Sequence, residues 1–529
     1  MTFHILITDQ LDSPGRAILQ AAEDAIVSGP YQSRAKMLAA LPEADAVIVR
    51  ASTRVDEEFL AAASKLQVIA RAGERIENID IEAATRRGML VLNVPDANVT
   101  AVVEHTFGLL LSLARSIPAG HSAMRRGEWP RHAMRGFLLA GKTLGIIGFG
   151  QTGRALAIRA QAFDLNVLVY DPYIDLSFAR QQGVEIVNFP ELLARADILS
   201  LHTAYSAQTH AIMDAAAFAQ MKPGSYFVNC THPGLVDETA LLQALENGAL
   251  AGAALDQFSV EPPPPDAPLR LHPKVLATPH LGENTVESQR QTSVQIAADT
   301  LSALCGEDYR NVVNLPFVPE TPYHAVKPYM HLASKLGKLQ GQLADGWITR
   351  IEVELLGEGL DGLIRPVAAV LLNGLLRPVD CCTVNWVSAP MLAHEQGITT
   401  AQVKGLVDQA DYPNLIACKI YWDGGERTVA GVLFGNGEAR LVQYDQFEVD
   451  AYPEGYVLIL ENDDVPGVIG KVGARLGRGQ INVAQWRYGR EKPGGRAVSF
   501  INIDDPVPAA LRDELESEPE IRRARLVRL

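Results

Sequence analysis

The sequence is poor in cysteine, in long apolar runs and in excess positive charge. Five cysteines in 529 residues show no spacing typical of metal ligands, so we expect reduced, mostly buried thiols, no disulfide framework and no metal site. No apolar run approaches the roughly 20 residues that cross a bilayer. A formal net charge of −15 argues against nucleic acid or an anionic membrane as a general partner. The cysteines are Cys230, Cys305, Cys381, Cys382 and Cys418.

What is present is the composition of a large globular protein. Hydrophobic residues make up 47% and charged residues 21% of the chain, as in ordinary folded domains. Because single cores rarely grow beyond ~300 residues, the length predicts several domains. The start, MTFHILITDQ, is typical of a first β-strand rather than of a targeting signal, so we expect a cytoplasmic protein.

The strongest motif is a glycine-rich turn between two apolar runs. LGIIGFG is followed by an Ala-rich helical pattern, and a second apolar run ends at Asp171. Strand, glycine turn, helix, strand and acid, in this order, form the dinucleotide-binding fingerprint. Gly148 would permit the tight turn, Gly150 the close approach of a pyrophosphate and Gly153 the packing of helix on strand. A GxGxxG motif alone would also fit a tight loop in an unrelated fold.

The same motif indicates which dinucleotide binds. The N-terminus of the predicted helix would offer free amides and a positive dipole end to the phosphates. Asp171 lies where a carboxylate accepts both ribose hydroxyls, which favours NAD over its 2′-phosphorylated relative. The cofactor-binding residues predicted from the motif are Gly148, Gly150, Gln151, Thr152, Gly153 and Asp171.

Short apolar runs alternate with helical patterns on both sides of an apolar helix predicted over Ala101–Leu113 and ended by Pro118. Before this helix lie HILITD, AVIVRAS, LQVIARAG and MLVLNVP, and after it the alternation restarts around the glycine turn. Such alternation predicts two parallel sheets covered by helices, with ligands bound at the carboxyl ends of strands in a cleft between two lobes. Residues 286–303, with apolar positions at helical spacing, would return the chain to the first lobe.

The last part of the chain has a different pattern. A Pro-rich segment, Leu315–Pro328, predicts a linker, which a helix over Leu332–Leu343 would follow. RTVAGVLFGNGEARLVQYD predicts a hairpin that turns at Gly435-Asn436-Gly437. The final ~75 residues read as strand, helix, strand, hairpin and helix, which is the order of a ferredoxin-like βαββαβ domain.

Two ionisable residues lie near predicted strand ends before residue 285. His280, in TPHLGENT, is the best candidate for an acid or base because a histidine side chain ordinarily titrates near neutrality. Glu261, in FSVEPPPPD, would hold the other ring nitrogen and favour the protonated imidazole. The alternatives are a loop histidine bonded to backbone and a solvated glutamate before prolines.

Together these motifs resemble the D-2-hydroxyacid dehydrogenase family, and within it the long-form D-3-phosphoglycerate dehydrogenases. The likeness runs through nearly the whole chain and includes VIVRAST, KLQVIARAG, GKTLGIIGFGQTG, TPHLGENT, VDAYPEG and NDDVPGVIGKVGARLG. It implies an α/β protein with two Rossmann-like lobes, an α+β intervening domain and a ferredoxin-like ACT domain. The implied bounds are 1–99 plus 286–318 for the substrate-binding lobe, 100–285 for the NAD-binding domain, 319–452 for the intervening domain and 453–529 for the ACT domain.

The resemblance also implies an activity and assigns residue roles. The activity is NAD-dependent oxidation of a D-2-hydroxy acid, with 3-phosphoglycerate at the entry to serine synthesis as the expected substrate, by a homodimer or homotetramer. His280 matches the family's acid/base histidine, Glu261 its partner and Asp256 an aspartate that contacts the nicotinamide carboxamide. Guanidiniums donate forked hydrogen bonds to phosphate, although a solvated face is the alternative for each arginine. The arginines matched to substrate contacts, the last from a neighbouring subunit, are Arg50, Arg71 and Arg131.

Two positions depart from the family pattern. His232 stands where the family has an arginine that polarises the substrate carbonyl and grips the carboxylate. The run Gly73-Glu74-Arg75-Ile76-Glu77 replaces a Gly-Thr-Gly-Val-Asp loop whose amides face that carboxylate. An imidazole lacks the guanidinium fork. We therefore hypothesise that Arg75 meets the substrate carboxylate while His232 donates one hydrogen bond to the carbonyl.

The same departures permit two other interpretations. The enzyme would act on a non-phosphorylated or bulkier 2-hydroxy acid, or the chain would be a catalytically weak paralogue that binds NAD and an amino acid and serves regulation. Glu74 favours the paralogue because a carboxylate repels an anionic substrate. The presence of His280, Glu261 and Asp256 together favours an enzyme.

The C-terminal domain carries candidate effector ligands. Asp464, two residues before Pro466, and Asn482 match positions that hold serine in serine-sensitive relatives, and Asn462 is a further candidate. A carboxylate can pair with the ammonium of an amino acid and an amide can bridge to its carboxylate. The alternative is that Asp464 and Asn482 cap helices.

Overall fold

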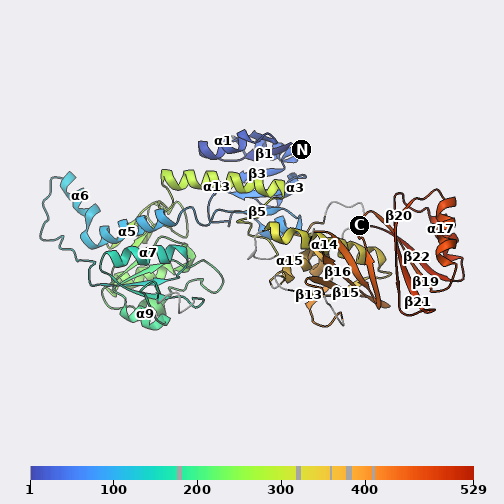
Figure 1. Cartoon of the computed structure of the whole chain (residues 1–529). Helices are drawn as coiled ribbons and strands as arrows, with labels where there is room; N and C mark the ends of the chain where they lie inside the picture. The colour runs from blue at the N-terminus through green and yellow to red at the C-terminus, as the bar shows by residue number, and fades with distance from the viewer. Residues whose placement is uncertain are drawn as a thin grey trace. The chain divides into compact units, whose positions relative to one another are not determined.

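The computed structural model describes residues 2–31, 33–174, 181–316, 323–357, 360, 362–376, 384–407, 412–435 and 437–529. The chain forms two compact units (Figure 1). One comprises Met1–Leu11, Ala17–Asn93 and Ile296–Leu529, and the other comprises Asp12–Arg16 and Val94–Gln295. Cys381, Cys382 and the predicted turn residue Asn436 lie outside the described residues.

The first sheet is parallel and has the strand order β2-β1-β3-β4-β5. All four predicted apolar runs form strands, and β2 was not predicted. In β3 and β4 every residue is buried, because helices cover both faces of a parallel sheet. The strands are β1 (Phe3–Ile7), β2 (Ala25–Ser28), β3 (Ala46–Val49), β4 (Val68–Arg71) and β5 (Leu90–Leu92). The helices are α1 (Ser13–Ala21), α2 (Arg34–Ala40), η1 (Leu41–Glu43), α3 (Glu57–Ala62) and α4 (Ile81–Arg86).

The second sheet is also parallel, with the order β12-β11-β10-β9-β6-β7-β8. Read from β8, this is the doubly wound order 3-2-1-4-5-6 with one further strand, and the order reverses between β6 and β9. The strands are β6 (Thr143–Ile147), β7 (Asn166–Tyr170), β8 (Glu185–Ile186), β9 (Ile198–Leu201), β10 (Ser225–Asn229), β11 (Leu250–Leu255) and β12 (Val275–Ala277). The helices are α5 (Val99–Arg115), α6 (Ile117–Arg125), α7 (Gln151–Ala162), α9 (Phe189–Arg195), α10 (Ala215–Gln220), η2 (Pro233–Leu235), α11 (Glu238–Glu246) and α12 (Pro268–Leu271). The next helix, α13 (Val286–Cys305), belongs to the other unit from Ile296 onward.

Two apolar clusters cover the faces of this second sheet. One contains Phe107 and Leu110 of α5 together with Leu156 of α7, and the other contains Phe218 of α10 and Leu241 of α11. Strand residues such as Ile146 and Leu199 alternate between the two clusters. The sheet is therefore a rigid, doubly covered platform whose polar strand ends carry the candidate site.

Two predicted helix boundaries were wrong, and both involve proline. The first helix ends at Arg115, where Ser116 takes a left-handed conformation (φ 51°), and Pro118 lies in the first turn of α6. Proline is favoured there because a first-turn amide has no partner within the helix. The predicted linker to Pro328 is instead helical from Tyr323, and residues 317–322 are outside the described part. Pro328 removes one hydrogen bond from this 21-residue helix.

The intervening region folds around a mixed sheet of order β14-β13-β15-β16-β17-β18. Only the β13–β14 pair is parallel, and β16 and β17 form the predicted antiparallel hairpin. The strands are β13 (Ile348–Leu356), β14 (Thr399–Gln402), β15 (Leu415–Trp422), β16 (Gly425–Leu433), β17 (Ala439–Tyr444) and β18 (Phe447–Ala451). The helices are α14 (Tyr323–Leu343), α15 (Ile364–Leu376) and α16 (Ala389–Glu395).

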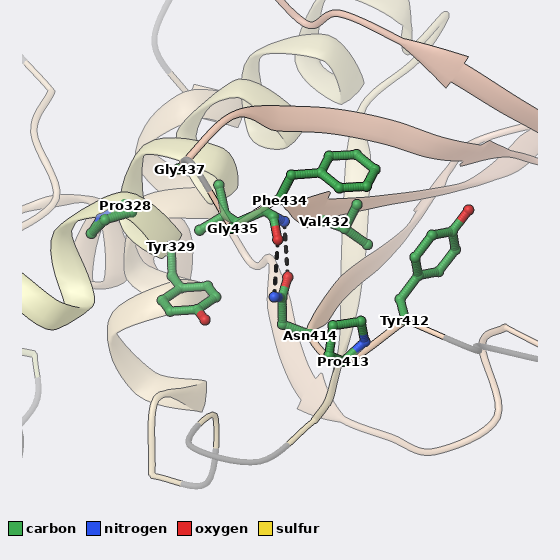
Figure 2. A pocket seen from close by; sticks show the side chains of 10 residues that line it. Pro328, Tyr329, Tyr412, Pro413, Asn414, Val432, Phe434, Gly435 and Gly437 are labelled. Atoms are coloured by element: carbon green, nitrogen blue, oxygen red, sulfur yellow. Dashed lines mark hydrogen bonds between the residues drawn. The ribbon is translucent and has the colours of Figure 1, made fainter.

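A pocket of about 390 Å³ opens beside this sheet (Figure 2). Tyr329, Tyr412 and Phe434 supply aromatic rings to its lining. The Asn414 side chain lies between Tyr329 and Tyr412 in this view and pairs with the main chain of Leu433 in both directions, at 3.0 and 2.8 Å (Figure 2). The Asn414 side chain thus continues the hydrogen-bond pattern between β15 and β16 and fixes one wall of the pocket.

The C-terminal region is the predicted βαββαβ unit. Its sheet is antiparallel with the order β20-β21-β19-β22, and Val472 and Leu476 of α17 contribute to its core. The strands are β19 (Tyr456–Asp463), β20 (Val483–Arg490), β21 (Arg496–Ile503) and β22 (Ile521–Arg528). The helices are α17 (Val468–Arg478) and α18 (Ala509–Glu516). The predicted fold class, two parallel Rossmann-like sheets followed by antiparallel-rich α+β parts, is confirmed.

The described residues also bear on the opening expectations. None of their helices is both long and apolar enough to cross a membrane. Cys230 and Cys418 are buried as expected, whereas Cys305 is exposed. Burial raises the pKa of the Cys230 and Cys418 thiols to about 12, which keeps both protonated and unreactive.

Candidate active site

The glycine turn lies at the carboxyl end of β6. Gly148 has φ +92°, and a Cβ there would stand 2.5 Å from the carbonyl oxygen of His202. A Cβ at Gly153 would stand 2.2 Å from the carbonyl oxygen of Gly148, so α7 can approach the turn only at a glycine. Gly150, the N-cap of α7, has no atom within 4 Å of the position its Cβ would take. The space that a pyrophosphate needs is therefore present beside the first amides of α7.

Asp171 follows β7 and faces this turn. Its Oδ2 accepts the amide of Phe149 at 2.8 Å, and its Oδ1 accepts the amide of Tyr173 at 2.9 Å. A carboxylate offers about four acceptor positions, so two amides fix its orientation and leave capacity for ribose hydroxyls. The turn, Gly150 and Asp171 together fit the adenosine half of NAD.

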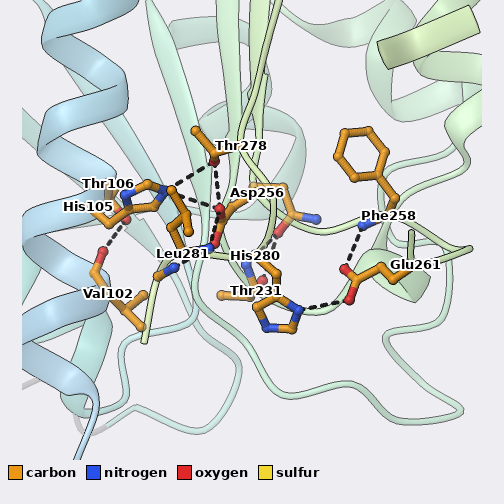
Figure 3. Close-up of polar contacts among 12 residues, drawn as sticks. Val102, His105, Thr106, Thr231, Asp256, Phe258, Glu261, Thr278, His280 and Leu281 are labelled. Carbon is orange, nitrogen blue, oxygen red and sulfur yellow. Dashed lines mark hydrogen bonds and ion pairs between the residues drawn. The ribbon is translucent and has the colours of Figure 1, made fainter. Parts of the chain in front are cut away.

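His280 and Glu261 lie side by side at the ends of β12 and β11 (Figure 3). His280 Nδ1 is 2.8 Å from Glu261 Oε2, and Glu261 Oε1 accepts the amide of Phe258 at 3.1 Å. His280 has φ +55°, an uncommon conformation for a residue with a side chain. Because the carboxylate accepts from Nδ1–H, the neutral ring has its lone pair on Nε2. The pair is thus arranged to accept a proton at Nε2.

Asp256 anchors the segment that carries His280 (Figure 3). Its carbonyl oxygen accepts the amide of His280 at 2.9 Å. Its carboxylate accepts the amides of Leu281 and Gly282, both at 2.8 Å, and the hydroxyl of Thr278 at 2.6 Å, and it lies 3.1 Å from Nε2 of His105. Burial acts to raise the pKa of Asp256, but these hydrogen bonds outweigh it and lower the pKa to about 2. The predicted contact of Asp256 with the nicotinamide carboxamide stays a prediction.

His232 lies in the turn after β10. Its Nδ1 accepts the amide of Gly234 at 3.0 Å. Its ring stacks on Tyr205, with centroids 4.2 Å apart and an interplanar angle of 15°. The imidazole is therefore held on one edge and one face by its own unit.

Two matched arginines lie at strand ends of the first sheet, Arg50 directly after β3 and Arg71 as the last residue of β4. The amide of Arg50 donates to Asp9 at 2.9 Å, and its guanidinium donates to the carbonyl of Gln10 at 3.4 Å. Arg71 is buried, 6% exposed, and its guanidinium donates to the carbonyl of Ala72 at 2.7 Å. Gly73 has φ +145°, and a Cβ there would stand 1.8 Å from Nη1 of Arg71, so any other residue would be strained and would displace the guanidinium.

The remaining predicted cations are more exposed. Arg75 forms an ion pair with Glu77 at 3.1 Å, so the long cation of the altered loop already neutralises a nearby carboxylate. Glu74 is exposed, and its carbonyl accepts the side-chain amide of Asn93 at 2.6 Å. Arg131 is exposed in a turn between α6 and β6.

Comparison with known proteins identifies the family. Residues 107–282 match the profile described as "D-isomer specific 2-hydroxyacid dehydrogenase, NAD binding domain". Residues 325–445 match "D-3-phosphoglycerate dehydrogenase intervening domain". A D-3-phosphoglycerate dehydrogenase of Methanocaldococcus jannaschii is 37% identical over 526 residues, covering 99% of both chains. That of Bacillus subtilis is 35% identical over 527 residues, covering 100% of both. The chain belongs to the D-2-hydroxyacid dehydrogenase family.

A solved structure supports this membership. A glyoxylate reductase from Paecilomyes thermophila is 28% identical with a TM-score of 0.54, covering 59% of this chain and 98% of its own. The predictions of the family, of NAD as the cofactor and of an NAD-dependent dehydrogenase are confirmed by the matched NAD-binding domain and the full-length relatives.

The C-terminal candidates lie around one carboxylate. Asp464 accepts the amide of Gly494 at 3.0 Å and the hydroxyl of Tyr488 at 3.1 Å, and Asn462 donates to the same hydroxyl at 3.2 Å. The Gly494 amide, with the Tyr488 hydroxyl and a nearby arginine, lowers the pKa of Asp464. The N-cap of α17 is Gly467, so Asp464 does not cap that helix.

Asn482 stands apart from this group in its contacts. Its side chain donates to Asp504 at 2.7 Å rather than capping a helix. The oxygen Oδ1 of Asn462, by contrast, is buried and has no hydrogen-bond partner among the described residues.

Sequence reasoning missed the residues that hold the predicted ones in place. His105 and Thr278 bind Asp256, Tyr205 supports His232, and Asp9 supports Arg50. His105 interrupts the apolar run AVVEHTFGLL, and this half-buried polar position was the one available signal. The other contacts join distant positions and carry no local pattern.

Proposed function

We propose that the protein oxidises 3-phosphoglycerate to 3-phosphohydroxypyruvate with NAD in L-serine biosynthesis. The pairing of His280 with Glu261 at the strand ends of the NAD-binding sheet is the observation that carries the proposal. Relatives named D-3-phosphoglycerate dehydrogenase that match the chain end to end support the substrate. In this proposal residues 1–99 with 286–318 bind substrate, 100–285 bind NAD, and 319–452 and 453–529 form the intervening and ACT domains.

The protein's own residues would move the proton. NAD, when bound, supplies a nicotinamide ring that accepts the hydride from C2 of the substrate. His280 Nε2 accepts the proton of the C2 hydroxyl as the C2–H bond breaks and the carbonyl forms. Glu261 stabilises the resulting imidazolium through Nδ1–H. In the reverse direction His280 returns the proton to the alkoxide oxygen, so one pair serves both directions.

Cationic side chains would hold the substrate's acidic groups. Arg50, Arg71 and, from a neighbouring subunit, Arg131 would bind the phosphate through forked hydrogen bonds. Arg75 would exchange Glu77 for the substrate carboxylate, and His232 would donate to the C2 oxygen. Exchange of one ion pair for another keeps the guanidinium paired and so costs little net Coulomb energy.

A second substrate class is favoured by one observation. His232 replaces an arginine of the family pattern, and one imidazole offers fewer donors than a guanidinium. A smaller or non-phosphorylated 2-hydroxy acid would need fewer of them, as the fold-level likeness to a glyoxylate reductase allows. A catalytically weak NAD-binding regulator is the remaining alternative.

Further properties belong to the same proposal. L-Serine would bind the C-terminal domain through Asn462, Asp464 and Asn482. The active form would be a homodimer or homotetramer, and the cytoplasm is its proposed location.

A screen of 2-keto acids with NADH tests the proposal. We expect 3-phosphohydroxypyruvate to give the highest kcat/KM, and His280→Gln to lower kcat by about 10³-fold or more while NADH still binds, because only proton transfer is lost. His324→Gln, on an exposed histidine of α14, serves as the matched control and should leave kcat within about 3-fold. A higher kcat/KM on a non-phosphorylated acid selects the second substrate class. No turnover on any acid overturns the enzymatic proposal.

A further inference from the structure

His232, Tyr205 and Gly234 form a built arrangement at the end of β10. The Gly234 amide donates to His232 Nδ1 at 3.0 Å, and the rings of Tyr205 and His232 stack at 4.2 Å. A Cβ at position 234 would stand 2.7 Å from the Tyr205 ring and 3.0 Å from His232 Nδ1. Any other residue at 234 would therefore require the Tyr205 ring to shift.

The side chain of Asn229, at the end of β10, fixes the turn that carries His232. Asn229, 1% exposed, accepts the amide of Thr231 at 3.0 Å and donates to the carbonyl of His232 at 3.3 Å. The chain then enters the short helical turn η2. Both the backbone and the ring of His232 are thus held before any substrate arrives.

The contact at Nδ1 determines where the ring proton lies. An amide N–H is a donor, so Nδ1 must act as an acceptor and cannot carry a proton. A neutral imidazole then has its proton on Nε2 and presents a single N–H donor from that edge. An arginine at this position would instead present a forked, permanently charged pair of donors.

We propose that Tyr205 and Gly234 lock His232 as a neutral Nε2–H donor that binds the substrate oxygen at C2. The proposal rests on the proposed function and deepens it. The site would polarise a 2-keto oxygen with one neutral hydrogen bond in place of the family's guanidinium. Tyr205 is then a positioning residue, which acts on the reaction only through the His232 ring.

The tautomer is measured directly in the full-length protein. Two-bond nitrogen–proton NMR spectra of the ¹⁵N-histidine-labelled chain, with His232 assigned by the loss of its signal in His232→Gln, report which nitrogen is protonated. We expect protonated Nε2 and bare Nδ1 at pH 7.5 in wild type and in Tyr205→Phe. In Tyr205→Ala we expect exchange between tautomers. Protonated Nδ1 in the wild type would overturn the proposal.

Kinetics of two matched variants test the donor. In His232→Gln the side-chain amide nitrogen would lie near the position of the ring Nε2, whereas in His232→Asn the shorter side chain would place it near the position of Nδ1. His232→Gln should therefore retain kcat/KM within about 10-fold, and His232→Asn should lose about 10²–10³-fold.

The positioning role of Tyr205 has its own kinetic test. Tyr205→Ala should lower kcat by about 10-fold or more, with rescue by Tyr205→Phe and no change in NADH affinity, because the stacked ring acts only on the orientation of His232. Tyr412→Ala, on an exposed tyrosine of the intervening region, is the control.

The two proposals fail in distinguishable ways. If the wild type turns over no 2-keto acid, the proposed function fails, but the NMR spectrum still shows whether His232 is held in the Nε2–H tautomer. If the wild type is active and His232→Asn equals His232→Gln, the donor role of Nε2 is wrong although the dehydrogenase assignment stands.

Discussion

The carboxylate of Asp256 is fully buried near the proposed base, and several hydrogen bonds compensate for its burial. Its Oδ1 accepts from Leu281 and Thr278 and its Oδ2 from Gly282. These bonds fix the backbone on the C-terminal side of His280, whose φ of +55° needs such support. At the residue scale, then, the proposed catalytic histidine depends on an ionised aspartate that need not touch the substrate.

Replacing Asp256 by Asn tests this dependence. One carboxylate oxygen would become an NH₂ facing a donor, so we expect a loss of about 3 kcal/mol in the free energy of unfolding at pH 7. The folded pKa of about 2 lies below the ordinary value of 3.8, so the ionised form stabilises the fold above pH ~4 and this contribution falls as the pH approaches 2. The wild-type advantage should therefore shrink by about 1 kcal/mol between pH 5 and pH 3 in urea titrations. Asp266→Asn, on an exposed loop, should show no such change, and a pH-independent difference would contradict the account.

At the scale of elements, two glycines of the β6–α7 turn have different roles: Gly153 is needed for packing and Gly150 for cofactor binding. A Cβ at Gly153 would meet the Gly148 carbonyl, whereas a Cβ at Gly150 would meet no protein atom and would project into the space proposed for pyrophosphate. We expect Gly153→Ala to lower stability by about 1–3 kcal/mol. Gly150→Ala should keep the wild-type melting temperature and weaken NADH binding at least 10-fold. Calorimetry and NADH fluorescence titration measure both variants, each being the other's control. Wild-type affinity in Gly150→Ala would contradict this assignment.

The same elements show what a sequence can predict. The strands β3 and β4 are buried at every residue and the glycine spacing is local, so both were found from pattern alone. The predictions at Pro118 and Pro328 were wrong because proline usually ends a helix. A first helical turn tolerates proline, as at Pro118, and the apolar packing of a long helix can offset the hydrogen bond that Pro328 removes. Contacts such as that between His105 and Asp256, 151 positions apart, depend on the packed sheet and have no local signal.

At the scale of the whole molecule, the C-terminal domain proposed to bind the effector, the intervening region and the first sheet belong to one compact unit. Hydrogen bonds join these three regions. The Gln342 side chain of α14 pairs with the main chain of Arg528 in β22 in both directions, at 2.9 Å each. Asn385 donates to the carbonyl of Gly88 at 2.7 Å, which ties the intervening region to the turn between α4 and β5. In the proposal, an effector bound at the C-terminal sheet would therefore act on a region that is hydrogen-bonded to that sheet.

L-Serine should therefore both stabilise the intact chain and slow its turnover. Binding at 100 times the dissociation constant adds about 2.7 kcal/mol to the free energy of unfolding, so the melting temperature should rise with serine concentration. The charge of Asp464 would pair with the serine ammonium, so Asp464→Asn should abolish both the rise and the inhibition while keeping kcat without serine.

Asp505→Asn, on an exposed aspartate of the same region, should respond as the wild type does. If serine raises the melting temperature of Asp464→Asn as much as that of the wild type, the effector ammonium is held by the buried acceptor Oδ1 of Asn462 or by other groups, and Asp464 is structural. A stabilised chain with unchanged turnover would place the ligand correctly but contradict the coupling through α14.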